Sequence, residues 1–316
     1  MENKIKIGIS SCLLGYNVRY DGGHKRDRFL TDTLVQYLEY VPVCPEVEYG
    51  LGIPREALRL VGDPDSPRLV TTKTNRDHTD RMLGWARKRV IELAREDLCG
   101  FIFKSNSPSS GMERVKVYTD KGMPVKKGVG IFARAFMEYF PLIPVEEEGR
   151  LHDAKIRENF IERIFTLRRW RQVLENRKTV GNLVDFHTRN KLLVLSHSPK
   201  HHSMMGKLVA GGKKIPIKKL YLKYEVLLME TLKLKTTVKK NINVLQHMMG
   251  YFKKQLSADE KQELLDIIKA YRLGHIPLIV PVTLFNHYVR KYHETYLSKQ
   301  TYLNPHPIAL HLRNHV

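Results

Sequence analysis

Three short apolar runs, each followed at once by a polar segment rich in turn residues, constrain the fold of this chain most strongly. The runs occupy residues 5–9, 40–43 and 99–103, and the polar segments occupy residues 10–22, 44–55 and 104–111. Such runs are typical of strands buried on both faces of a parallel sheet. Because parallel strands end at the same edge of a sheet, we expect the three segments to form loops that meet there.

Segments with helical periodicity separate these runs. Helices are predicted at residues 26–39, at residues 77–97 and from Gly128, with a last strand at residues 140–145. Pro54, Pro64 and Pro67 predict a long loop between the second run and the second helix. The alternation of strands and helices indicates an α/β, Rossmann-like domain with a parallel sheet over residues 1–148.

The second half of the chain is predicted to be helical throughout. Glu146-Glu147-Glu148-Gly149-Arg150 marks the boundary, because strand signals almost vanish after it. Helices are predicted at about residues 151–177, 180–195, 199–210, 217–233, 237–256, 258–272 and 281–298. The sixth has a clear start, since Ser257 and Glu260 have the spacing of a capping box. We therefore predict an all-α domain over residues 149–316.

Positive charge is concentrated in the predicted helical domain. The chain carries a formal net charge of +21; residues 1–148 hold 23 Lys and Arg against 21 Asp and Glu, and residues 149–316 hold 31 against 12. A nearly neutral domain joined to a domain of net charge +19 favours a chemical domain fused to a polyanion-binding domain. The alternative is a charge that serves only solubility. The asymmetry favours nucleic acid as the partner.

Basic and aromatic residues of the second half supply the candidate RNA contacts. Flexible basic stretches suit phosphate contact, and tyrosines among basic residues suit stacking on unpaired bases, with tyrosines packed against helices as the alternative. The RNA-binding candidates are Lys213, Lys214, Lys218, Lys219, Tyr221, Arg290 and Lys291. The histidines at positions 197, 201 and 202 have no carboxylate or thiol nearby in sequence. This favours an RNA contact or a solvated loop over a metal site.

Cysteine usage and hydropathy indicate a cytoplasmic protein. The chain contains three cysteines, an odd number that argues against a disulfide framework and for a reducing compartment. It has no apolar run of about 18 residues, so we expect no membrane span. Met1 leads into a strand without the apolar segment of a signal peptide. No protein partner is evident from the sequence.

Cys12 and Cys44 stand directly after predicted strands, in loops where backbone donors surround them. From the residues alone, two loop cysteines are consistent with a redox pair, with ligands of a metal cluster, or with no special role. Their separation of 32 residues excludes the CxxC-like pairs of zinc ribbons. Cys99 begins a strand instead, so we expect its sulfur at the opposite end of the sheet, as an ordinary buried thiol.

Three ordered motifs of the first half resemble those of the thiouracil desulfidase family (TudS-type). They are Ser10-Ser11-Cys12-Leu13-Leu14-Gly15 with Arg19-Tyr20-Asp21-Gly22, Cys44-Pro45-Glu46 with Gly50-Leu51-Gly52-Ile53-Pro54-Arg55, and Lys104-Ser105-Asn106-Ser107-Pro108-Ser109-Ser110-Gly111. This resemblance covers about residues 1–148. In general character and domain order, the second half resembles the domain fused to it in RudS-type tRNA 4-thiouridine desulfidases.

The resemblance implies an iron–sulfur enzyme. Its cofactor would be a [4Fe-4S] cluster held by three cysteines, two of them Cys12 and Cys44, with one open iron that takes the sulfur of a thiolated base. Water then replaces sulfur at the carbon without net redox chemistry. The positions that match the family's residues for proton and water handling are Glu46 and Ser105. Glu46 is well placed as a general acid/base, because it lies close to Cys44 in the sequence.

Ser110 departs from the family pattern, because it stands where the third cysteine belongs. A serine hydroxyl is a hard, weakly acidic ligand and a poor substitute for a thiolate. One explanation is an engineered substitution of this cysteine by serine. Another is a natural loss of the cysteine, which leaves a protein that binds its ligand without the reaction. A third explanation, replacement by Cys99, is disfavoured by the expected sheet geometry. We favour the engineered or inactive form for this chain.

These observations predict a tRNA 4-thiouridine desulfidase that releases uridine and sulfide, with activity in this chain dependent on the residue at position 110. An RNA-binding module that recognises thiolated tRNA without catalysis is one alternative. A desulfidase of free thiouracil, with an unrelated role for the basic half, is the other.

Overall fold

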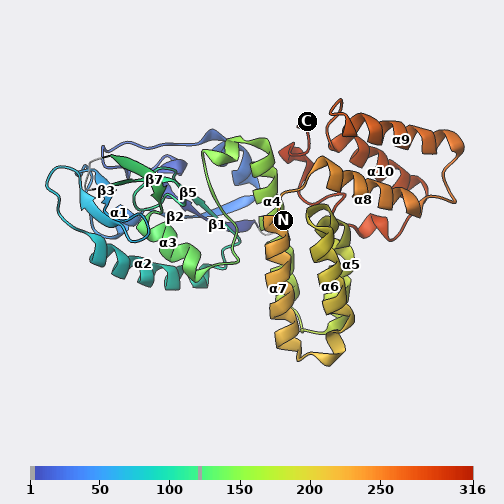
Figure 1. Cartoon of the computed structure of the whole chain (residues 1–316), viewed down its shortest axis with the longest axis horizontal. Coiled ribbons are helices and arrows are strands. Elements are labelled where there is room, and N and C mark those ends of the chain that lie inside the picture. Colours follow the sequence, from blue (N-terminus) through green and yellow to red (C-terminus); the bar gives the residue numbers. More distant parts are fainter. Residues whose placement is uncertain (1–3, 120–122, 316) are drawn as a thin grey trace. The chain divides into compact units, whose positions relative to one another are not determined.

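The computed structural model describes residues 4–119 and 123–315, and the chain forms two compact units, Met1–Ile156 and Arg157–Val316 (Figure 1). The first unit contains parallel strands and helices, and the second is helical, which confirms the predicted fold class. The division between the units falls in the first turn of helix α4 (Ala154–Glu175).

A four-stranded parallel sheet forms the centre of the first unit. Its strands lie in the order β2-β1-β5-β8, with the bounds β1 Ile5–Ser10, β2 Leu38–Val43, β5 Phe101–Phe103 and β8 Val145–Glu147. Ile7 and Ile9 of the central strand β1 are fully buried, as expected of a strand in the interior of an α/β layer. The carboxyl ends of β1, β2 and β5 therefore lie side by side.

Helices α2 (Thr79–Leu93) and α3 (Ile131–Tyr139) bury their apolar residues in one core with the sheet. Aromatic rings dominate this core: the ring centroids of Phe101 and Phe103 lie 4.3 Å apart, and those of Phe101 and Phe136 lie 4.7 Å apart. Gly8 makes this packing possible, because a Cβ there would lie 2.2 Å from the Phe101 ring. The close approach of β1 to Phe101 thus depends on a residue without a side chain.

A second sheet, which the sequence did not predict, lies in the same unit. Its order is β4-β3-β6-β7, with the bounds β3 Leu58–Val61, β4 Arg68–Thr71, β6 Val115–Tyr118 and β7 Pro124–Gly128. Strands β3 and β4 form an antiparallel pair within the segment that was predicted to be a loop. Each strand has only four or five residues, so the alternation of apolar and charged residues in β3 and β6 is too short to give a clear strand signal.

The prediction of one helix over residues 26–39 is wrong. A π-helix covers Phe29–Thr33 and a 3-10 helix covers Leu34–Gln36, after which β2 begins. Leu30, Leu34 and Leu38 are buried, as their spacing indicated. However, Leu38 is the first residue of β2 and pairs with Ile5 of β1. Apolar spacing alone does not distinguish a continuous helix from a helix that passes into a strand.

The second unit consists of helices at nearly the predicted positions. After α4 they are α5 Val180–His197, α6 Pro199–Ala210, α7 Ile217–Lys233, α8 Val238–Tyr251, α9 Ala258–Arg272 and α10 Ile279–Lys291. The capping box predicted at Ser257 is present, with both of its hydrogen bonds. Trp170 of α4 is fully buried, with its ring centroid 5.1 Å from those of Phe186 and Tyr224. No helix within the described residues has the length and apolar character needed to cross a membrane.

Candidate active site

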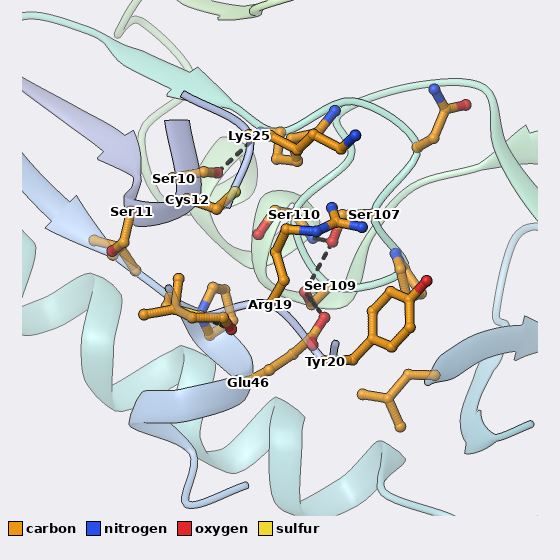
Figure 2. Close-up of a pocket in the computed structure, with 18 of the residues that line it drawn as sticks. Ser10, Ser11, Cys12, Arg19, Tyr20, Lys25, Glu46, Ser107, Ser109 and Ser110 are labelled. Carbon is orange, nitrogen blue, oxygen red and sulfur yellow. Dashed lines mark hydrogen bonds between the residues drawn. The ribbon is translucent and has the colours of Figure 1, made fainter. Parts of the chain in front are cut away.

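The three predicted loops converge on one pocket at the carboxyl ends of β1, β2 and β5. The pocket has a volume of about 450 Å³, within the usual range for small-molecule sites. Its walls come from residues 10–12 at the end of β1, residues 44–46 after β2 and residues 104–110 after β5. Figure 2 shows Cys12, Glu46 and Ser110, three residues predicted to belong to the site, around this pocket.

Cys12 and Cys44 both line the pocket, and Cys99 does not. Cys12 lies in the 3-10 helix Ser11–Leu14, and Cys44 immediately precedes helix α1 (Pro45–Glu48). Burial raises the pKa of the Cys12 thiol to about 11, against the opposing effect of Lys104, and burial also raises the pKa of Cys44. Cys99 is buried just before β5, so it lies at the opposite end of the parallel sheet, as predicted.

Ser110 lies in the loop after β5, where α3 fixes its position. The backbone N–H groups of Ile131 and Phe132 donate to the carbonyl oxygens of Pro108 and Ser109, at 3.2 and 2.9 Å. Gly130 allows this contact, because a Cβ there would lie 2.5 Å from the Ser109 carbonyl carbon. The first turn of α3 therefore holds the loop, and Ser110 is 4% exposed at the pocket wall.

The carboxylate of Glu46 is held from two sides. Arg55 donates to Glu46 Oε2 through Nη2 and Nε, at 2.5 and 3.0 Å. Ser109 donates from Oγ to Glu46 Oε1 at 2.9 Å, and the hydroxyls of Ser107 and Ser109 are 3.1 Å apart. These contacts form a chain of polar groups that runs from the carboxylate along the loop towards Ser110, whose backbone N–H donates to Ser107 Oγ.

Ser105 lies at another part of the pocket and contacts a different carboxylate. Its hydroxyl donates to Glu148 Oε1 at 2.7 Å, and its backbone N–H donates to Glu148 Oε2 at 2.7 Å. Lys104 forms an ion pair with the same carboxylate and donates to Ser105 Oγ at 2.9 Å. The serine that reaches Glu46 is Ser109, and the catalytic role of Ser105 stays a prediction.

Neither Arg55 nor Ser109 was predicted as a site residue from the sequence, although both lie in the motifs that resemble the family. The distance in sequence between Glu46 and Ser109 is 63 residues, so their contact depends on tertiary structure. Arg55 could have been predicted, because it is a cation in the same motif as Glu46, and a buried carboxylate requires a cationic or hydrogen-bonding partner. Its side chain is 7% exposed and that of Glu46 is 15% exposed.

Aromatic and basic side chains surround the mouth of the pocket. Tyr20 is 43% exposed, and the Arg19 guanidinium lies 5.4 Å from the centroid of its ring. Arg19 is paired with Asp21 at 3.4 Å. Lys25 also lines the pocket, and it forms no ion pair with any carboxylate in the described part of the chain. The mouth thus combines a ring that can stack on a base with a cation that is free to meet an anion (Figure 2).

The pocket contains one thiol fewer than the three cysteines that the family resemblance implies. Two thiols and one hydroxyl line the same cavity, on the three loops that the family motifs identify. Clusters of this kind are held by thiolates, and the Ser110 oxygen is a harder donor.

The RNA-binding candidates lie in the second unit, and the structure separates them into groups. Lys213 and Lys214 form the 3-10 turn between α6 and α7, and Lys218 and Lys219 lie in the first turn of α7. These four lysines are exposed and have no ion pair among the described residues. They stay predicted phosphate contacts.

Tyr221 requires a correction. It is 2% exposed, its ring centroid lies 5.5 Å from that of Trp170, and its hydroxyl donates to the Thr179 carbonyl at 2.8 Å. A buried ring cannot stack on RNA, so the stacking role predicted for Tyr221 is wrong.

The remaining candidates lie at the end of α10. Arg290 is exposed, and Lys291 is paired with Glu260 at 2.6 Å. The prediction of an RNA contact or a solvated loop is wrong for His197, which is fully buried at the end of α5 and bonded to Glu162.

Comparisons with known proteins match both halves of the chain. Residues 7–148 match the family described as 2-thiouracil desulfurase, and residues 191–307 match a family described as a protein of unknown function, DUF1722. The uncharacterized protein YbgA of Escherichia coli (strain K12) is 32% identical over 153 residues, which are 48% of this chain and 90% of YbgA. The uncharacterized protein YbbK of Bacillus subtilis (strain 168) is 31% identical over 110 residues, which are 33% of this chain and 72% of YbbK.

A solved structure, the [4Fe-4S]-dependent thiouracil desulfidase TudS, is 27% identical. The match covers 48% of this chain and 95% of that chain, with a TM-score of 0.37. The family matches and the ordered motifs agree on the same part of the sequence. Through residues 7–148, this chain belongs to the 2-thiouracil desulfurase family, with a DUF1722 region at residues 191–307.

Proposed function

We propose that this protein is a tRNA 4-thiouridine desulfidase whose activity is limited by Ser110. The observation that carries the proposal is the convergence of two thiols, the Ser110 hydroxyl and the Glu46 carboxylate on one pocket of a 2-thiouracil desulfurase domain. The reaction replaces the C=S group of the base with C=O, consumes one water and releases hydrogen sulfide, so no external oxidant or reductant is needed.

Cys12, Cys44 and the residue at position 110 would hold the cluster. When bound, a [4Fe-4S] cluster with one open iron supplies a Lewis acid with high affinity for the sulfur of the base. Glu46 is suited to take a proton from the attacking water and to return it to the departing sulfur, because Arg55 and Ser109 fix both of its oxygens. Tyr20, exposed at the mouth, is suited to stack on the base.

The charge distribution supports tRNA as the substrate. Residues 149–316 hold 31 Lys and Arg against 12 Asp and Glu, which suits contact with a phosphate backbone. A free thiouracil base is uncharged and has no need of this surface.

One observation favours a second candidate function. The missing third thiolate suits a protein that binds thiolated tRNA without converting it, because two cysteines hold a cluster poorly. The iron content of the purified protein distinguishes the desulfidase from the binding protein, because a protein that only binds thiolated tRNA needs no iron.

The test is anaerobic reconstitution of Ser110→Cys with iron and sulfide, followed by incubation with tRNA that contains 4-thiouridine. We expect this variant to bind about four irons per chain, as a cubane cluster requires, and to convert 4-thiouridine to uridine faster than the unaltered chain. Cys99→Ser is the matched control, because it removes a thiol outside the pocket and should leave iron binding unchanged. If Ser110→Cys binds no iron, the catalytic part of the proposal is wrong.

A further inference from the structure

A second pocket lies in the helical unit, between α5 and α6. Its volume is about 470 Å³. Helices α5 and α6 face each other across it, and the turn after α6 adds Lys213. The lining includes Val184, His187 and Lys191 from α5 and His202, Gly206 and Val209 from α6. The DUF1722 match covers Lys191 to Lys213 and assigns no activity to this pocket.

The lining of this pocket is both apolar and basic. Val184 is 42% exposed, and Val209 lies on the facing helix. Lys191 and Lys213 supply positive charge, and no Asp or Glu is among the lining residues. An occupant must therefore offer negative charge beside a flat or apolar group.

Two imidazole rings complete the lining. Burial lowers the pKa of His187 to about 4, with His202 and Lys191 acting in the same direction. Burial also lowers the pKa of His202. Both rings are therefore neutral near neutral pH. His187 is buried, and its Nδ1 lies 3.2 Å from the Tyr224 hydroxyl, so this ring forms part of the pocket wall. His202 is half-buried, and its neutral imidazole can stack on a nucleobase and can donate and accept hydrogen bonds at its edge.

The basic end of the pocket is extended by a turn that is distant in sequence. The Tyr221 hydroxyl donates to the Thr179 carbonyl at 2.8 Å and accepts from the Thr179 N–H at 3.2 Å. A Cβ on Gly212 would lie 3.5 Å from Val180 Cγ1. These contacts place the turn between α4 and α5 beside the turn between α6 and α7.

Both turns carry basic side chains. Arg177 and Lys178 precede Thr179, and Lys213 and Lys214 follow Gly212. None of the four has an ion pair with a carboxylate in the part of the chain that the structure describes. The two turns thus form one basic tip, defined here as Arg177, Lys178, Lys213 and Lys214, at the ends of these helices (Figure 1).

We propose that the pocket between α5 and α6 binds an unpaired base of a single-stranded RNA segment, whose phosphates contact the basic tip. The charge complementarity of tip and backbone, together with the apolar and imidazole lining, favours this occupant. Polyglutamate would meet the tip but has no flat group for the pocket. This inference rests on the proposed function in one respect, that the substrate is RNA.

The first test fills the pocket. Gly206 lines the pocket, and a Cβ there would meet no atom within 4 Å, so the larger side chain of Gly206→Leu is chosen to reduce the space left for a base. Its melting temperature should equal or exceed that of the unaltered chain, because leucine favours a helix over glycine. Affinity of the full chain for a labelled oligouridylate, measured by fluorescence anisotropy, should fall about tenfold, the scale of one stacked base.

Two controls accompany this variant. Gly206→Ala adds only one methyl group and should retain most of the affinity. An abasic oligonucleotide of the same length should bind Gly206→Leu and the unaltered chain equally, because it lacks the base. Unchanged oligouridylate affinity in a folded Gly206→Leu protein would overturn the proposal. The proposal would also be overturned if Gly206→Leu lost as much affinity for the abasic strand, for polyglutamate or for vesicles of anionic lipid as for oligouridylate.

The second test removes charge from the tip. Lys213→Ala with Lys214→Ala should weaken binding of both strands and reduce the slope of log K against log salt by about 1.4, the value for two phosphate contacts on a single strand. Lys253→Ala with Lys254→Ala removes the same charge from an exposed site outside the tip and should change the slope little. An equal change in this control would overturn the proposal.

The outcomes separate this inference from the proposed reaction. If Gly206→Leu lowers RNA affinity while Ser110→Cys leaves 4-thiouridine intact, the pocket is supported and the desulfidase proposal fails. If Ser110→Cys converts tRNA and Gly206→Leu binds RNA normally, the desulfidase proposal stands and the pocket proposal fails.

Discussion

At the scale of single residues, the position of Glu46 depends on its partners. Arg55 binds Glu46 Oε2 and also donates to the Val18 carbonyl at 3.0 Å, so one guanidinium joins the loops after β1 and β2. Ser109 binds the other oxygen. A lysine at position 55 would lack the planar fork that makes two bonds to one carboxylate. The geometry of this carboxylate therefore depends on arginine at position 55.

Removal of this arginine should be costly to stability. We expect Arg55→Met to lower the free energy of unfolding by about 3 kcal/mol, because it leaves Glu46 mostly buried without its cation. Adding Glu46→Gln should recover part of the loss, since the unpaired charge is then gone. Urea denaturation of the two single variants and the double variant measures this. Additive losses would show that the two side chains are not coupled.

At the scale of elements, local sequence signals set the helix boundaries of the second unit. The side chains of Thr179, Ser198, Thr237 and Ser257 all accept a backbone hydrogen bond at the start of a helix. Helix α6 begins with Pro199, whose missing N–H costs nothing in the first turn. These signals are local, which is why helix bounds could be predicted closely from the sequence.

The capping box of α9 provides a test at this scale. Ser257→Ala removes the bond from Ser257 Oγ to the Glu260 N–H, which spans 3.2 Å. We expect a loss of about 1 kcal/mol in unfolding free energy, the usual value for an N-cap. Ser298→Ala, at an exposed serine whose hydroxyl donates to the Thr295 carbonyl and caps no helix N-terminus, is the control. Equal losses in both variants would contradict the capping interpretation.

The packing of α5 against α6 and α7 makes stability depend on pH. His187 contacts the Tyr224 hydroxyl of α7, at 3.2 Å, and its pKa is about 4 because burial, then His202 and Lys191, disfavour the charged ring. The unfolded chain has a histidine pKa of about 6.5, so it binds more protons than the folded chain between pH 4 and 6.5. Stability from this group is therefore present above pH 6.5 and is lost as pH falls towards 4.

We expect His187→Gln to flatten this dependence, by up to about 1.4 kcal/mol per pH unit at its steepest. Chemical denaturation at several pH values between 4 and 7 measures the slope. His306, whose pKa burial also lowers to about 4, remains in both proteins, so the comparison isolates His187. Parallel curves for the two proteins would contradict the assignment.

At the scale of the whole molecule, the chain joins a nearly neutral unit to a strongly basic one. Residues 1–148 and 149–316 carry net charges of +2 and +19. The chemical groups of the candidate site lie in the first unit, and the candidate RNA contacts lie in the second. This division suits a substrate with a reactive base and a long phosphate backbone.

Binding of tRNA by the full chain should therefore depend steeply on salt. We expect the Kd for tRNA to rise about 100-fold or more between about 50 and 200 mM salt, because several phosphate contacts release counterions. Filter binding at a series of salt concentrations measures this. A Kd that hardly changes with salt would show that the basic surface does not contact the backbone.

The sequence by itself determined the features that depend on local order along the chain. Periodicity predicted the parallel strands, and the loops after them carry Cys12, Cys44, Glu46 and Ser110 to one edge because parallel strands share their direction. Helix signals and charge predicted the basic helical half. The second sheet was missed, because its short strands β3, β4, β6 and β7 are stabilised by pairing rather than by a strong local pattern.

Only the tertiary structure decided which side chains meet. It brought Ser109 to Glu46 across 63 residues, placed Ser105 against Glu148, buried Tyr221 and formed the pocket between α5 and α6. Each outcome depends on contacts between residues far apart in the chain. The energy of such contacts is not encoded in any local pattern of residue types, so a sequence predicts which groups are available and the fold decides which of them act together.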